Sequence, residues 1–586
     1  MKLYSQLLYK VSISVLFLGA CAPMAEYGPE KNAVMNVSVL AFNDFHGHLE
    51  PPLVSIRETV GNVPTEVPAG GAAYLSAAIQ HLKKQHPLHA VVSAGDMIGA
   101  SPLTSALFLD EPTIEAVNAM GIDFNAVGNH EFDKGTAELL RMRFGGCQKF
   151  TRIEPCQVSP KFAGANFEFL AANVKQESQS NLFPSYGFKT FKMGQRESKI
   201  AFVGLTLKGT PKMVTPDGIK GLSFEDEAKT ANALVPELKA KGASALVLVI
   251  HEGGVIKGGH NDASCPGLSG DIVPILNNLD PAYDIVISGH THRAYACDYS
   301  RVNPQKPFLL TSAGQYGTML THIQLSIDPV KNKVISKSAF NLVVQSEPFV
   351  NSAGQRIETT NAIPYYGKHN SVEKIVSEYQ AAAQVHVQKV IGHLPASMVR
   401  RFSPSGESAL GNMIADAQLF ASAPKDKGHA DIALMNPGGV RADLPVPLGG
   451  GTVNFGQIFK VQPFGNTLVV KQMTGQQIKD VLEFQFDNKA RPKVLFPSST
   501  LNYEIDMKKE IGQRVENIKI SNQALDLKQK YKVTVNSFIA SGGDGFWHFK
   551  QAETVYEGEL DVDALAAYIK ASPSMKVPEL NRIRML

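Results

Sequence analysis

The chain has 586 residues, with 57 Lys plus Arg against 54 Asp plus Glu and 44% hydrophobic residues. This balance excludes a disordered or fibrous protein, and the length indicates at least two domains, since one domain usually holds roughly 100 to 200 residues. A net charge of only +3, without a run rich in Lys and Arg, gives no electrostatic basis for binding nucleic acid.

Residues 1–21 have the pattern of a signal peptide. Two lysines precede or flank the apolar run 11–18, which is too short to span a bilayer, and the tetrapeptide Leu-Gly-Ala-Cys ends at Cys21. This tetrapeptide resembles the lipobox of bacterial lipoproteins, which implies a lipid anchor on that cysteine as the only membrane contact. Because Ala22 follows in place of an aspartate, we expect the outer membrane or a periplasm-facing position. The alternative, an ordinary secretory signal, also predicts export.

Four further cysteines, Cys147, Cys156, Cys265 and Cys297, form an even set in an exported chain, which predicts disulfides. The sequence leaves all three pairings open. A zinc–cysteine cluster is disfavoured because the chain has no Cys-x-x-Cys pair.

From about residue 37 to 317, β-branched apolar runs alternate with turns and with stretches of helical spacing, which predicts alternating strands and helices. Several runs are apolar throughout, as expected for strands that are covered on both faces. We therefore predict an α/β fold with helices packed in layers on sheet. The predicted strands are 37–42, 90–93, 124–127, 200–205, 245–250, 285–287 and 308–310.

Near residue 350 this pattern lapses into a polar, proline-containing stretch. Apolar residues at helical spacing then predict a connecting helix, although a plain surface helix of either domain explains them equally well. A second pattern follows, with a helix-like stretch at 409–420 and strand-like stretches at 432–435, 467–471 and 532–536. We predict a first domain at 34–350, a linker helix at 368–392 and a second domain at 393–586.

Polar residues follow five of the predicted strands directly. In an open α/β sheet the carboxyl ends of the strands share one edge, where ligands bind, so these distant clusters are expected to converge. Each cluster alone is weak evidence for a ligand-binding site, since Gly-Asp after a strand is often only a turn. The prediction of a shared site therefore rests on all five clusters together. The clusters are Asn43-Asp44-Phe45-His46, Gly95-Asp96, Gly128-Asn129-His130-Glu131, His251-Glu252 and Gly289-His290-Thr291-His292.

The side chains at this edge have the composition of a site for two divalent metal ions, with zinc or manganese favoured by imidazole and carboxylate ligands. Seven ligands shared by two metals leave positions for water and substrate, which indicates a catalytic rather than a structural site. The candidate ligands are Asp44, His46, Asp96, Asn129, His251, His290 and His292.

These motifs resemble the metallophosphoesterases and, within them, the secreted 5'-nucleotidases. The resemblance implies a four-layer sheet-and-helix catalytic domain joined by a helix to an α/β substrate-binding domain. It also implies that Asp44, His46 and His292 ligate one metal, that Asn129, His251 and His290 ligate the other, and that Asp96 bridges them. Some relatives have glutamine at the position of His292, so the metal preference of this chain need not match theirs.

The resemblance implies a catalytic dyad of His130 and Asp133. Three residues apart, they share a face if a helix begins here, so that Asp133 would orient the imidazole and favour its protonated form. In this family two cations activate water for in-line attack on phosphorus, while the histidine stabilises charge on the phosphate. The alternatives are a supporting buried histidine and a helix-start aspartate.

Three segments of the second domain resemble the nucleotidase substrate domain. The implied roles are stacking of a base between Phe464 and Phe538, base or hydroxyl contacts from Asn466 and Asp544, and pairing of Arg441 with phosphate. Without the resemblance, the two phenylalanines would be ordinary core residues. The full implied set is Asn436, Gly439, Arg441, Phe464, Asn466, Phe538, Asp544 and, on the argument below, Arg401.

One position departs from the family. Many relatives have an arginine where this chain has Gly406, just before a predicted helix. Arg400 or Arg401 would compensate, and we take Arg401 as the candidate, although both residues fit solvated surface positions equally well.

The sequence thus predicts an exported dinuclear-metal 5'-nucleotidase that hydrolyses nucleoside 5'-monophosphates, with UDP-sugars or dinucleotides as further substrates. The alternatives are a 2',3'-cyclic phosphodiesterase/3'-nucleotidase, a thiosulfohydrolase, and a non-enzymatic surface lipoprotein that binds nucleotides or a host partner. Asp133 and the two phenylalanines favour the nucleotidase, and the complete ligand set opposes the non-enzyme. Oligomeric state is left open.

Overall fold

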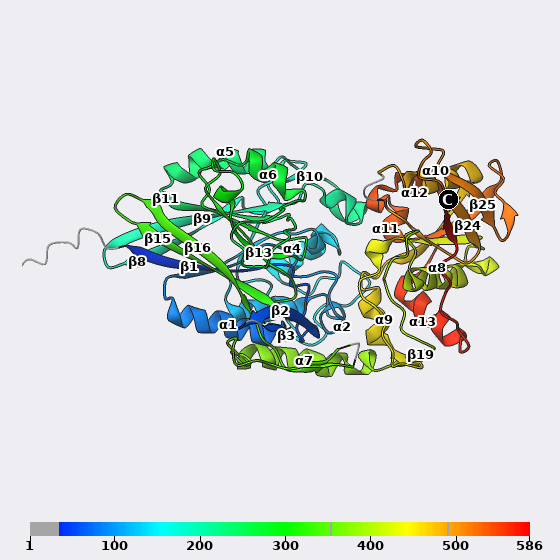
Figure 1. Ribbon diagram of the computed structural model, residues 1–586, viewed down its shortest axis with the longest axis horizontal. Helices are drawn as coiled ribbons and strands as arrows, with labels where there is room; N and C mark the ends of the chain where they lie inside the picture. The colour runs from blue at the N-terminus through cyan, green and yellow to red at the C-terminus, as the bar shows by residue number, and fades with distance from the viewer. Residues whose placement is uncertain (1–33, 62, 352–353, 489–491) are drawn as a thin grey trace, which may run out of the picture.

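The computed structural model describes residues 34–586 except 62, 352–353 and 489–491. The predicted signal peptide and lipobox at 1–21 lie outside the described residues. Figure 1 shows two lobes, an N-terminal lobe coloured blue to green and a C-terminal lobe coloured yellow to red. Among the helices that the structure describes, none has the length and apolar character needed to cross a bilayer.

Two six-stranded sheets form the centre of the N-terminal lobe. The first has the order β16-β15-β1-β4-β5-β6 and the second the order β13-β14-β12-β11-β9-β8. The strands of the first sheet are β1 (Met35–Phe42), β4 (His89–Ser93), β5 (Phe124–Ala126), β6 (Glu168–Leu170), β15 (Met319–Asp328) and β16 (Lys333–Val343). Those of the second are β8 (Tyr186–Met193), β9 (Arg196–Thr206), β11 (Ala243–His251), β12 (Ile285–Ser288), β13 (Ala294–Asp298) and β14 (Leu309–Ala313).

The two sheets pack face to face, and helices cover their outer faces. Val39, Val92 and Val247 belong to one buried cluster between the sheets. The first sheet shares a second cluster with α1 (Ala72–Gln85), α3 (Glu111–Met120), α4 (Thr136–Phe144) and α7 (Asn370–Val387), and the second sheet shares a third with α5 (Glu227–Ala240) and α6 (Ile272–Asn278). This arrangement confirms the predicted four-layer α/β fold.

We expected the polar clusters to lie along the edge of one open sheet, and this was wrong because they are divided between two sheets. The polar clusters follow β1, β4 and β5 in the first sheet but β11 and β12 in the second. The parallel pairs within each sheet nevertheless bring the carboxyl ends together at the same end of the sandwich. The edge strand β16 was not predicted, because its side chains are mostly exposed or half-buried and give no continuous apolar run.

Helix α7 lies along the N-terminal lobe (Figure 1). It buries Val372 and Val376 in the cluster under the first sheet, and the Tyr379 hydroxyl donates a hydrogen bond to Glu115 on α3. The helix falls inside the predicted linker range, while the predicted domain boundaries at 34–350, 368–392 and 393–586 stay a prediction.

The C-terminal lobe contains a five-stranded sheet and a four-stranded sheet. The first is built from β20 (Ile432–Met435), β22 (Thr467–Thr474), β23 (Phe496–Pro497), β27 (Lys530–Asn536) and β28 (Glu553–Leu560), and the second from β24 (Leu501–Ile505), β25 (Val515–Ile520), β26 (Gln523–Ala524) and β29 (Ile583–Met585). The helices are α8 (Ala409–Ser422), α9 (Phe455–Val461), α10 (Gly475–Phe484), α11 (Ser537–Ala540), α12 (Trp547–Gln551) and α13 (Asp561–Ala571).

Apart from the 3-10 helices, the remaining short elements are α2 (Leu103–Ala106) and four pairs of strands. The pairs are β2 (Val54–Val60) with β3 (Val63–Ala69), β7 (Val174–Gln176) with β10 (Leu222–Phe224), β17 (Phe349–Val350) with β18 (Arg356–Ile357), and β19 (Val390–Leu394) with β21 (Gly451–Asn454). Disulfides join Cys147 to Cys156 and Cys265 to Cys297, which selects one of the three pairings left open by the sequence.

Candidate active site

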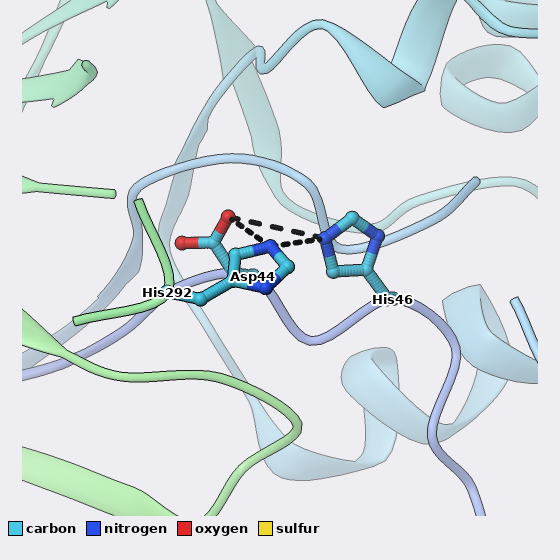
Figure 2. A group of neighbouring side chains, drawn as sticks. All are labelled: Asp44, His46 and His292. Atoms are coloured by element: carbon cyan, nitrogen blue, oxygen red, sulfur yellow. Dashed lines mark hydrogen bonds and ion pairs between the residues drawn. The ribbon is translucent and has the colours of Figure 1, made fainter. Parts of the chain in front are cut away.

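Asp44, His46 and His292 meet at the carboxyl ends of the central strands (Figure 2). The Nε2 atom of His292 lies 3.4 Å from Oδ1 of Asp44 and 3.1 Å from Nε2 of His46. Asp44 and His46 are both buried. Three potential ligand atoms therefore face one point, although His292 is more than 240 residues from the other two in sequence.

A second group lies beside the first and consists of Asp96, His251 and His290. Oδ2 of Asp96 is 3.0 Å from Nε2 of His251 and 3.7 Å from Nε2 of His46. Asp96 thus contacts ligand candidates of both groups, as the predicted bridging residue should.

The donor atoms fit divalent cations. Oδ1 of Asn129 is buried and, among the described residues, has no hydrogen-bond partner. Burying such an atom without a partner is costly, so a cation accounts for it better than an empty space does. Four imidazoles, two carboxylates and one amide oxygen suit zinc or manganese.

Two carbonyl groups fix the histidine rings. Nδ1 of His46 donates to the Gly99 carbonyl at 2.9 Å, and Nδ1 of His251 donates to the Ala94 carbonyl at 2.7 Å. Since a carbonyl only accepts, each ring carries a proton on Nδ1, and Nε2 is the ring atom that points into the cluster.

The backbone at the cluster is strained. Five of the seven predicted ligands have a φ in the left-handed region, which side chains other than glycine rarely adopt. The φ values are 49° at Asp44, 46° at His46, 50° at Asp96, 69° at His290 and 57° at His292. Such strain persists only where the surrounding structure enforces it, and it concentrates at functional sites.

Glu131 organises these loops, a role that the sequence reasoning missed. Its buried carboxylate accepts hydrogen bonds from the backbone N–H groups of Asp96 and Gly128, at 2.9 and 2.8 Å, and of Met97 at 2.9 Å. The only signal in the sequence was its place inside the Asn-His-Glu motif, next to His130.

Imidazoles around the acidic ligands keep them ionised. Burial alone would raise the pKa of Asp96, but the charges of His251 and His130 outweigh it and hold that pKa well below its ordinary value. An ionised carboxylate between the two groups suits a cation-binding role.

His130 and Asp133 form the predicted pair. His130 begins the short 3-10 helix His130–Phe132, and Nδ1 of its ring lies 2.8 Å from Oδ2 of Asp133. Burial lowers the pKa of His130, but the carboxylates of Asp133 and Asp96 outweigh it, so the pKa is raised. The contact leaves Nε2 free to face a substrate.

A cavity of about 290 Å³ lies between the two lobes, next to the dyad. His130, Asp133, Asn129 and His290 line it from the N-terminal lobe. From the C-terminal lobe it is lined by seven of the predicted substrate residues, which are Asn436, Gly439, Arg441, Phe464, Asn466, Phe538 and Asp544.

Contacts within the cavity bring base-binding and catalytic candidates together. The ring of Phe464 is nearly parallel to that of His130, with centroids 5.7 Å apart and 10° between planes. The Arg441 guanidinium lies 5.6 Å from the centroid of Phe464. The Asn436 amide donates to Asp544 at 2.8 Å, which fixes both side chains in the cavity wall.

Comparisons with known proteins agree with this geometry. Residues 37–294 match the model for calcineurin-like phosphoesterases, and residues 390–551 match the model for the C-terminal domain of 5'-nucleotidases. The chain belongs to the 5'-nucleotidase family of metallophosphoesterases.

Similar proteins match most of the chain. A 5'-nucleotidase of Vibrio cholerae is 24% identical over 592 residues, which cover 96% of this chain and 95% of that protein. Endonuclease YhcR of Bacillus subtilis is 28% identical over 91% of this chain, but the chain spans only 39% of its length. The crystal structure of a 5'-nucleotidase precursor from Thermus thermophilus shares the fold, with a TM-score of 0.69, 24% identity, and coverage of 94% of this chain and 99% of that one.

One predicted site residue lies elsewhere in this nucleotidase-family chain. Arg401 is exposed and is not among the residues that line the cavity. Its neighbour Arg400 is exposed too, and its backbone N–H donates to Asp443. The sequence reasoning also missed three lining residues of the N-terminal lobe, Met213, Val214 and Thr215, because no motif marks them.

Proposed function

We propose that the protein is an exported dinuclear-metal 5'-nucleotidase that hydrolyses nucleoside 5'-monophosphates to nucleoside and phosphate. The observation that carries this proposal is the single cavity that joins the dyad and the ligand cluster to Phe464, Phe538 and Asp544. A site for phosphate chemistry is thereby continuous with two aromatic rings that suit a nucleobase.

The two groups of ligands would each hold one cation. Asp44, His46 and His292 would bind the first, Asn129, His251 and His290 the second, and Asp96 both. When bound, the pair of cations supplies Lewis-acid activation of water and neutralises charge on the phosphoryl oxygens.

The protein side chains bind and orient the substrate. The base packs between Phe464 and Phe538, and the Arg441 guanidinium pairs with phosphate. As water adds to phosphorus and the ester P–O bond breaks, protonated His130 stabilises the charge on the phosphate through Nε2. Asp133 holds that ring in place through Nδ1.

An assay of phosphate release tests this function and separates its alternatives. With manganese or zinc added, we expect release from AMP, whereas a cyclic phosphodiesterase would prefer cyclic nucleotides. UDP-glucose and NAD would report pyrophosphate cleavage. A thiosulfohydrolase or a non-enzymatic binding protein would release no phosphate from any of them, and that result would refute the proposal.

We also propose that the mature protein carries a lipid on Cys21. The support is the lipobox-like tetrapeptide that ends at this residue. Growth of producing cells with a radioactive fatty acid should label the wild-type protein and leave a Cys21→Ser variant unlabelled, whereas an unlabelled wild-type protein would rule the anchor out.

A further inference from the structure

Residues Met213, Val214 and Thr215 form a wall of the cavity that comes from the catalytic lobe. They follow the 3-10 helix Thr210–Lys212, which lies against the 3-10 helix Gly543–Gly545 of the C-terminal lobe. Asp544 in that second helix lines the same cavity. The segment therefore meets the nucleoside-binding side of the cavity from across the lobe boundary.

The segment is fixed to the lobe that carries the dyad. Val214 is buried in the core under the first sheet. The Thr136 hydroxyl, at the start of α4, donates to the Gly218 carbonyl at 2.8 Å, just beyond the segment. Because both sides of the segment are anchored, Met213 and Thr215 are held on either side of buried Val214.

These two side chains offer complementary contacts. Met213 is 37% exposed although it lines the cavity, and its thioether suits contact with an aromatic ring. In the described part of the chain, the Thr215 hydroxyl makes no hydrogen bond to protein, so its donor and acceptor capacity is available to a ligand.

We propose that Met213 and Thr215 recognise the base of the nucleotide, Met213 by packing on it and Thr215 by a hydrogen bond. This inference rests on the proposed nucleotidase function. Phe464 and Phe538 stay with the base whatever the position of the lobes. Met213 and Thr215, in contrast, reach it only when the lobes are together. Their contacts with the base thus help to place the phosphate beside His130.

Two variants and two substrates test the proposal. Met213→Ala and Thr215→Val are assayed on AMP and on ribose 5-phosphate, which keeps the phosphate and sugar but lacks the base. We expect kcat/KM for AMP to fall about tenfold in each variant and that for ribose 5-phosphate to stay unchanged. Lys212→Ala is the matched control, since Lys212 is exposed and does not line the cavity, and both substrates should be unaffected.

An equal loss on both substrates would mean that the segment supports the dyad and would overturn the proposal, as would unchanged AMP kinetics. Equilibrium dialysis with adenosine gives a readout that needs no turnover, and both variants should bind it more weakly than the wild type. If the wild type does not hydrolyse AMP, the proposed function fails. The adenosine affinities would still decide whether Met213 and Thr215 contact the base.

Discussion

Glu131 supports the ligand cluster without contacting a substrate. Its carboxylate accepts three backbone N–H groups from the loops that carry Asp96 and Asn129. In Glu131→Gln, one oxygen is replaced by an N–H donor that faces those N–H groups, so the loops should shift. We expect a loss of about 10- to 100-fold in manganese affinity, measured by isothermal titration calorimetry. Wild-type affinity in a folded variant would show that the loops hold their shape without this carboxylate.

His130 is the residue for which we expect the largest effect on turnover. Removing the imidazole in His130→Ala should lower kcat for AMP by about 10² or more, because charge on the phosphate loses its partner. Metal content, measured by atomic absorption, should stay at the wild-type level, since this ring is outside the proposed ligand set. Near-normal turnover would remove the dyad from the mechanism.

Metal-binding residues could be predicted where a sequence motif itself contains the side chain that binds the metal. Asp44 and His290 could be assigned because each directly follows an apolar strand and has a side chain that binds metals. Glu131 and Thr215 could not, since their roles depend on backbone groups and on a lobe contact that arise only on folding. The assignment of Arg401 relied on a neighbouring departure from the family, and the structure places it outside the cavity lining.

Among the secondary-structure elements, α13 begins with a buried carboxyl group. Asp561 is 2% exposed, and burial raises its pKa from 3.8 to about 7. The folded chain therefore holds a proton on Asp561 that the unfolded chain releases between these values. The contribution of this bound proton to the free energy of unfolding is complete below about pH 4 and is lost as the pH rises through about 7.

Asp561→Asn tests this because the amide is neutral at every pH. The free energy of unfolding of the variant, relative to wild type, should rise between pH 5 and pH 8 by an amount on the order of 3 kcal/mol. Urea titrations at the two pH values measure it. Asp563→Asn, on the exposed side of the same helix, is the control and should change less. Identical pH profiles for Asp561→Asn and wild type would contradict the buried, protonated carboxyl.

Elements were predictable when their side chains are apolar on both faces, as in β1 and β11. The antiparallel edge strand β16 was not, because a strand whose side chains are mostly exposed or half-buried resembles a loop in composition. The stacking of two sheets could not be read from strand order, because the sequence does not specify which strands pair.

At the scale of the whole molecule, the cavity is lined by residues of both lobes, so a change in the distance between the lobes would change access to it. Residues 368–392 were the predicted connection, but α7 packs on the N-terminal lobe along much of its length. We therefore place the hinge at the end of α7, between Val387 and β19.

Small-angle X-ray scattering tests this separation. The substrate-free protein should have a larger radius of gyration than the same protein with a non-hydrolysable AMP analogue, because the analogue contacts both lobes. Manganese without the analogue is the control, because all of its proposed ligands belong to the N-terminal lobe. A radius unchanged by a saturating analogue would indicate that the lobes do not move.

The parallel rings of His130 and Phe464 couple base preference to catalytic rate, two properties that are usually engineered separately. A variant library at position 464, made to change which base is preferred, would also alter the surroundings of the imidazole that faces the phosphate. Selectivity and rate should consequently rise or fall together along such a library, and a designer who wants a new preference at full speed would do better to begin from Phe538.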